Sequence, residues 1–117
     1  MKPKYSLKNN FLYAMDGAKE VFKEVSFKIE IFFFVLMSVV LVILPYPLWA
    51  KIFMFSSMLF PVIAEIFNTA IEKTVDLASE DFHHLAKKAK DISAFGVFVS
   101  VFIPVFVWGG FIIYFWS

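Results

Sequence analysis

Four polar residues follow one another at spacings that could support chemistry. Asn68, Glu72 and Asp76 come three, seven and eleven residues after Glu65. In an α-helix these offsets place all four side chains on one stripe, with Glu72 about 10 Å further along the axis than Glu65. Carboxylates near a surface suit Mg²⁺, which prefers oxygen ligands and is usually completed by substrate phosphates. A carboxylate lying deeper can accept a proton from a hydroxyl group.

Glu65 is the only charged residue among the twenty residues from 52 to 71. A carboxylate at bilayer depth is expensive unless it has partners or water, which indicates a functional role. We therefore predict that Glu65 is a general base for a hydroxyl group, and that Asn68 holds either this carboxylate or the substrate. Lysines further along can neutralise phosphate oxygens. Together these groups predict phosphoryl transfer to a lipid alcohol.

The sequence has none of the usual nucleotide-binding signatures. It contains no Gly-rich phosphate loop of the Walker type and no kinase catalytic-loop motif. A nucleotide site in this chain must therefore be unconventional.

The composition is that of an integral membrane protein. The 117 residues are 61% hydrophobic and 21% aromatic, and the mean hydropathy is +0.78, whereas an ordinary soluble domain is nearer half apolar. The absence of cysteine excludes disulfides and thiolate chemistry. The net charge of +1 argues against nucleic acid as a partner. We predict an all-α membrane protein.

Four helical segments should position the polar groups, all within a single domain covering residues 1–117. An amphipathic helix at about 5–28 should lie on the membrane surface, with Tyr13, Gly17 and Glu24 along one flank. The alternative for this helix is packing against the spans without contact to substrate. Three membrane spans are expected at about 30–50, 52–77 and 91–116, with a loop at about 78–90. Only Lys51 separates the first two spans, which predicts a tight turn there.

The lysines predict the orientation in the membrane. Ten of the eleven lysines lie before the first span or between Glu72 and the third span. By the positive-inside rule, the N-terminus and the loop before the third span face the cytoplasm. The chemistry-bearing groups therefore gather on the side where nucleotides are found.

Plainer interpretations stand beside this hypothesis. Lys87 and Lys88 are typical of topology signals, and Asp76 can simply pair with a neighbouring lysine. A small proton or cation transporter also uses a membrane carboxylate, and a non-catalytic helical assembly subunit is a third class. The transporter does not need carboxylates and lysines gathered on one side. The assembly subunit leaves Glu65 and Asn68 without a purpose.

The segment AEIFNTAIEKTVDLASEDFHHLAKKAKDISA resembles the signature of the prokaryotic diacylglycerol kinase and undecaprenol kinase family. The resemblance includes the Glu, Asn, Glu, Asp spacing and the closing Ala, Lys, Asp. It implies a bacterial cytoplasmic membrane enzyme that transfers the γ-phosphate of MgATP to a lipid alcohol. The implied lipid is diacylglycerol, with undecaprenol as the alternative. The resemblance also implies a homotrimer whose active sites are shared between subunits.

The resemblance implies roles for individual residues. Glu65 corresponds to the general base, Asn68 and Lys90 to further catalytic residues, and Glu24 and Glu72 to the Mg²⁺ ligands. The residues implied to contact ATP are Tyr13, Glu24, Glu72, Asp81, Phe82, His83, Lys90 and Asp91. Glu65 and Ala94 correspond to positions that contact the lipid substrate.

Two features depart from the family pattern. Glu24 follows Gly17 by seven residues, where the family usually has eight. Ala94 stands where diacylglycerol kinases often have Ser. The undecaprenol branch often has a small apolar residue at this position, so Ala94 keeps both lipids open.

Overall fold

The computed structural model describes residues 4–78 and 83–117, which form four α-helices and no strand. The helices are α1 (Leu7–Val21), α2 (Val25–Ile43), α3 (Leu48–Ala78) and α4 (His84–Tyr114). Three of them, α2, α3 and α4, are long and apolar enough to cross a membrane. The predicted all-α membrane fold, with one short helix and three spans, is confirmed.

The short helix α1 ends earlier than the surface helix expected at 5–28. Ser6 caps its N-terminus by accepting a hydrogen bond from the Asn9 backbone N–H at 3.3 Å. The helix stops at Val21, and a turn leads into α2, which begins at Val25. Glu24 is the N-cap residue of α2. The predicted placement of Glu24 on the flank of the surface helix is therefore wrong.

The turn between the first two spans lies before Lys51 and not at it. α2 ends at Ile43 and α3 begins at Leu48, because Pro45 and Pro47 in the connection disfavour helix at and before their positions. Lys51 lies inside α3, where its Nζ donates a hydrogen bond to the Val42 carbonyl at 3.1 Å. This contact satisfies a carbonyl in the last turn of α2, which has no partner within its own helix.

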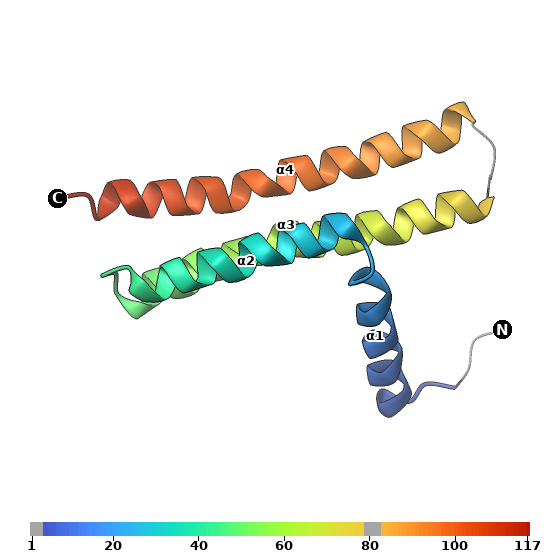
Figure 1. Cartoon of the computed structure of the whole chain (residues 1–117), viewed down its shortest axis with the longest axis horizontal. Helices are drawn as coiled ribbons and strands as arrows, with labels where there is room; N and C mark the ends of the chain where they lie inside the picture. The colour runs from blue at the N-terminus through green and yellow to red at the C-terminus, as the bar shows by residue number, and fades with distance from the viewer. Residues whose placement is uncertain (1–3, 79–82) are drawn as a thin grey trace.

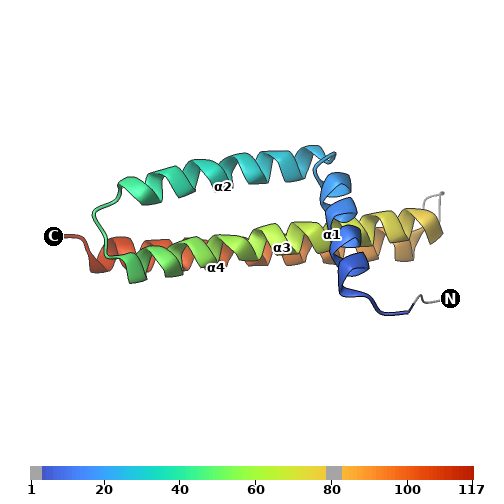
Figure 2. The ribbon, with the colours of Figure 1, turned by 90° about the horizontal axis from the view of Figure 1, so that it is seen from below.

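Helix α3 is the element around which the chain is arranged. It runs antiparallel to both α2 and α4 and packs against each of them (Figures 1 and 2). In Figure 1, α4 lies beside α3 and α2 overlaps it, whereas in Figure 2, α2 lies beside α3 and α4 overlaps it. Helices α2 and α4 therefore lie on two different sides of α3. Helix α1 lies across the direction of the three long helices in both views.

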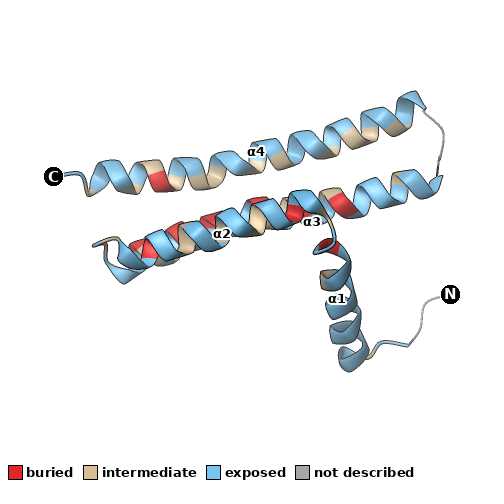
Figure 3. Cartoon of the chain, in the orientation of Figure 1, coloured by how far each residue is buried: buried red, intermediate tan, exposed pale blue. Residues whose placement is uncertain are grey.

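A small core joins the three long helices at the end away from α1. It is formed by Leu41 of α2, Met54 and Met58 of α3, and Trp108 of α4. The Trp108 indole N–H donates to the Met54 carbonyl at 3.0 Å, which fixes α4 on α3. Most other side chains of the spans are exposed in the single chain (Figure 3), as expected for helices that face lipid or other membrane helices.

Candidate active site

Glu65 is buried on α3 and held by a residue of α2. Its side chain is 6% exposed, and its Oε1 accepts a hydrogen bond from the Ser26 hydroxyl at 2.9 Å. It lies four residues after Pro61, which is also buried and which cannot donate to the carbonyl one turn earlier. A carboxylate with one hydroxyl partner, on a membrane-spanning helix, has the features of a proton acceptor shielded from bulk water.

A second carboxyl group, Glu30, lies one turn beyond Ser26 on α2, and the sequence reasoning missed it. Its Oε1 is buried and has no hydrogen-bond partner within residues 4–78 and 83–117. The signal was the four-residue spacing from Ser26 to Glu30, which places both on the face of α2 that meets α3. The predicted first span begins at about residue 30, at the membrane surface, where a charged side chain is not unusual.

The amide of Asn68 binds Glu72 and not Glu65. Asn68 Nδ2 donates to Glu72 Oε1 at 2.9 Å, one turn along α3. The interpretation that Asn68 holds the Glu65 carboxylate is therefore not what the structure has, because Ser26 makes that contact. The Asn68 Oδ1 atom is buried and has no hydrogen-bond partner in the described part of the chain. This oxygen can accept a hydrogen bond from a ligand.

Glu24 contacts α3 through an ion pair with Lys73. Its Oε1 lies 3.2 Å from the Nζ of Lys73, the residue next to Glu72. Within the described residues, no group of three or more His, Asp or Glu side chains gathers to form a metal site. Two carboxylates at one end of the α2–α3 pair nevertheless fit Mg²⁺, because that ion usually takes one or two protein carboxylates and completes its shell with water and phosphate oxygens.

Charged pairs cover the ends of α3 and α4 next to the undescribed segment 79–82. Lys90 Nζ lies 2.5 Å from Asp76 Oδ1 and so joins α4 to α3. Lys87 pairs with Asp91 one turn along α4. His83 is the N-cap residue of α4, and its Nδ1 accepts from the Leu85 backbone N–H at 3.0 Å.

Tyr13 and Ala94 take no part in these polar contacts within the described residues. Tyr13 is exposed on α1 and Ala94 is exposed on α4. Asp81 and Phe82 lie outside the described residues. The structure therefore brings four pairs together: Glu65 with Ser26, Asn68 with Glu72, Glu24 with Lys73, and Asp76 with Lys90.

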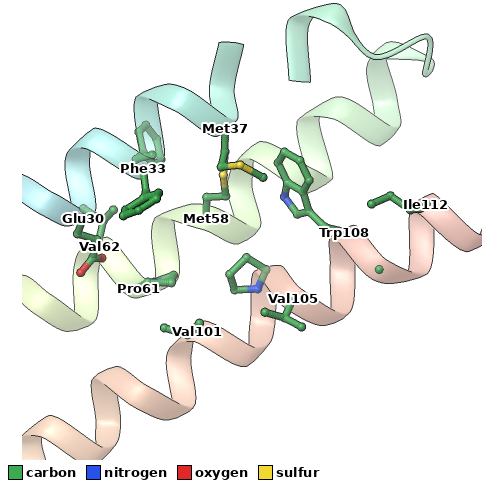
Figure 4. Close-up of a pocket in the computed structure, with 13 residues that line it drawn as sticks. Glu30, Phe33, Met37, Met58, Pro61, Val62, Val101, Val105, Trp108 and Ile112 are labelled. Atoms are coloured by element: carbon green, nitrogen blue, oxygen red, sulfur yellow. The ribbon is translucent and has the colours of Figure 1, made fainter. Parts of the chain in front are cut away.

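An apolar groove of about 620 Å³ runs between α2 and α4 over α3. Figure 4 shows Glu30 towards one end of the groove and Ile112 towards the other, with Trp108 between them. The walls are otherwise formed by hydrophobic side chains, by Pro61 and Pro104, and by Gly109. A groove of this composition suits an apolar chain that carries a polar group at one end.

The chain has three helices that are long and apolar enough to span a membrane. It also has a buried carboxylate, Glu65, and an apolar groove. These are the features of an integral membrane protein that binds an apolar ligand beside polar side chains. Residues 12–112 match the family described as prokaryotic diacylglycerol kinase. The chain belongs to this family. The resemblance inferred from the sequence is confirmed, and the chain is an enzyme of the lipid kinase class.

Individual relatives agree with this assignment. The chain is 33% identical over 103 residues to a diacylglycerol kinase of Haemophilus influenzae, covering 87% of each chain. It is 38% identical over 52 residues to a diacylglycerol kinase of Helicobacter pylori, covering 44% of this chain and 41% of the relative. It is 33% identical over 58 residues to a diacylglycerol kinase of Escherichia coli K12, covering 50% of this chain and 48% of the relative.

Proposed function

We propose that this chain transfers the γ-phosphate of ATP to the hydroxyl of diacylglycerol, giving phosphatidic acid and ADP. The observation that carries the proposal is the buried Glu65 carboxylate, 6% exposed, on the same helical stripe as Asn68 and Glu72. The helix rise separates Glu65 from Glu72 by about 10 Å along α3. This separation allows a lipid hydroxyl near Glu65 to meet the γ-phosphate of an ATP molecule that is bound near Glu72 at the membrane surface. The names of the relatives support diacylglycerol as the lipid.

In the proposed reaction, Glu65 accepts the hydroxyl proton as the lipid oxygen attacks the γ-phosphorus. The O–H bond breaks, a new O–P bond forms, and the bond from the γ-phosphorus to the bridging oxygen breaks to release ADP. Glu24 and Glu72 would hold Mg²⁺, which would neutralise charge on the phosphate oxygens. The Asn68 amide fixes the Glu72 carboxylate through its 2.9 Å hydrogen bond.

The charged residues at the ends of α3 and α4 bind the nucleotide in this proposal. Lys90 supplies a cation to the phosphates and counts as a catalytic residue, since phosphoryl transfer depends on neutralising developing charge. The other proposed contacts to ATP are Tyr13, Asp81, Phe82, His83 and Asp91. The apolar groove beside Glu30 supports binding of acyl chains, and Ala94 is proposed to contact the lipid.

The proposed setting is the bacterial cytoplasmic membrane, with the N-terminus and the segment between α3 and α4 in the cytoplasm. Residues 1–117 act as one domain, and three copies form a homotrimer with shared active sites. The exposure of most span residues in the single chain leaves room for such assembly. A transporter function is not favoured, because the chain belongs to a kinase family.

The test is phosphate transfer from γ-labelled ATP by purified protein in mixed micelles. Diacylglycerol, undecaprenol and no added lipid form the three arms. Labelled phosphatidic acid formed faster than labelled undecaprenyl phosphate supports the proposal. The opposite order assigns the undecaprenol alternative, and the absence of any labelled lipid would contradict a lipid kinase.

A further inference from the structure

The hydrogen bond to Glu65 comes from α2, and no spacing in the sequence connects the two residues. Ser26 Oγ donates to Glu65 Oε1 at 2.9 Å across the α2–α3 contact, between residues 39 positions apart. No hydrogen bond to the second carboxylate oxygen, Oε2, occurs within the described ranges 4–78 and 83–117. The Ser26 contact therefore leaves one oxygen of Glu65 available to another group.

The position of Ser26 is fixed by its neighbours in α2. The next residue, Phe27, is 3% exposed, and its ring meets the Phe22 ring edge to face at a centroid distance of 4.9 Å. Glu24, two residues earlier, is the N-cap residue of α2. The backbone at Ser26 is therefore held between a buried aromatic residue and a helix start, so its hydroxyl is presented to α3 from a defined place.

A hydroxyl in this place has a specific consequence for a general base. Proton transfer needs the accepting oxygen within hydrogen-bond reach of the proton, and small misplacements of a catalytic group are costly in rate. A Glu side chain has several rotatable bonds, and a hydrogen bond donated to one oxygen restricts them. Two other nearby polar groups do not do this, because Asn68 donates to Glu72 and the Oε1 atom of Glu30 has no hydrogen-bond partner in the described part of the chain.

We propose that Ser26 is a positioning residue for Glu65: its hydroxyl holds Oε1 and so aims Oε2 at the lipid hydroxyl. This inference rests on the proposed function, in which Glu65 is the general base. Ser26 itself does not exchange a proton with the substrate. Its contribution is therefore expected in the turnover number, while the binding of ATP and lipid is left nearly unchanged.

The experiment compares Ser26→Val with Ser26→Thr. Valine and threonine have nearly the same shape, but threonine has a hydroxyl where valine has a methyl group. Because Ser26 is exposed in the single chain, both side chains are accommodated. A hydrogen bond to a charged group gives an effect of about tenfold in kcat, so Ser26→Val should lose about that factor and Ser26→Thr should keep most of the activity. The KM values for ATP and lipid should stay within about twofold. Ser38→Val is the matched control, because the Ser38 hydroxyl donates to Phe34 of its own helix.

The same substitution in a Glu65→Gln background separates positioning from a general structural role. If Ser26 acts through Glu65, adding Ser26→Val to Glu65→Gln should cost nothing further. An equal loss in both backgrounds, or wild-type kcat for Ser26→Val beside an inactive Glu65→Gln enzyme, would overturn the positioning role alone. Wild-type kcat for Glu65→Gln would overturn the base assignment and, with it, the role of Ser26.

Discussion

At the scale of single residues, Lys73 shares the Glu24 carboxylate that is proposed to bind Mg²⁺. The Lys73 Nζ lies 3.2 Å from Glu24 Oε1, and both side chains are about half exposed. A cation already paired with a metal ligand must be displaced before the ligand can bind the metal. The apparent affinity for Mg²⁺ therefore includes the free energy of breaking this ion pair.

Replacing Lys73 should reduce the Mg²⁺ requirement. Exposed ion pairs contribute roughly 0.2–1 kcal/mol, so Lys73→Met should lower the Mg²⁺ concentration for half-maximal turnover by at most about fivefold. The measurement is turnover against Mg²⁺ concentration at fixed ATP. Lys23→Met is the control, since Lys23 pairs with Glu20 on α1 at 2.9 Å. A higher Mg²⁺ requirement in Lys73→Met would contradict competition at Glu24.

Two lysines of α4 should differ in their effect on ATP. Lys90 joins α4 to α3 through Asp76, whereas Lys87 pairs within α4 with Asp91. If Lys90 binds the phosphates, Lys90→Met should raise the KM for ATP about tenfold or more, because bonds to charged groups contribute roughly 1.5–3 kcal/mol. Lys87→Met should change it far less. Equal KM values for the two variants would argue against a phosphate-binding role for Lys90.

At the scale of the helices, α4 is fixed to α3 by Trp108. Its indole N–H donates to the Met54 carbonyl at 3.0 Å, and its ring packs in the small core. Trp108→Phe should lose about 1 kcal/mol of the free energy of unfolding in micelles, in line with polar contacts between membrane helices. Trp116→Phe, at an exposed position near the C-terminus, should change nothing. A Trp108→Phe protein as resistant to SDS as wild type would show that the hydrogen bond is not stabilising.

The helices themselves were predictable from sequence, whereas their junctions were only partly so. Long apolar runs predicted three spans because burying a polar backbone in lipid requires a continuous helix. Pro45 and Pro47 are a usable signal for the turn, whereas the charge of Lys51 predicts a boundary that falls inside the first turn of α3. The contact of Ser26 with Glu65 depends on the register between α2 and α3. No periodicity within either helix encodes that register, so the contact and the orientation of Asn68 towards Glu72 needed the structure.

At the scale of the whole molecule, the orientation in the membrane decides whether the charged residues at the ends of α3 and α4, such as Asp76 and Lys90, can reach cytoplasmic ATP. Single cysteines replacing Lys4 and Lys88 should be protected from an impermeant thiol reagent added to intact cells, and one replacing Leu48 should react. The chain has no cysteine of its own to interfere. Permeabilised cells are the control, since all three positions should then react. Reaction of the cysteine at position 88 in intact cells would place the start of α4 outside the cell, away from cytoplasmic ATP.

The activity of Glu65→Gln decides whether Glu65 is the general base for the lipid hydroxyl. A positioned general base contributes typically 10²- to 10⁴-fold, so lipid-dependent turnover should fall by about that factor while ATP affinity is retained. Glu20→Gln is the matched control, because Glu20 is an exposed carboxylate on α1 that pairs with Lys23 at 2.9 Å. Its turnover should equal that of wild type. A Glu65→Gln enzyme that binds ATP and turns over within a few-fold of wild type would show that Glu65 is not the general base.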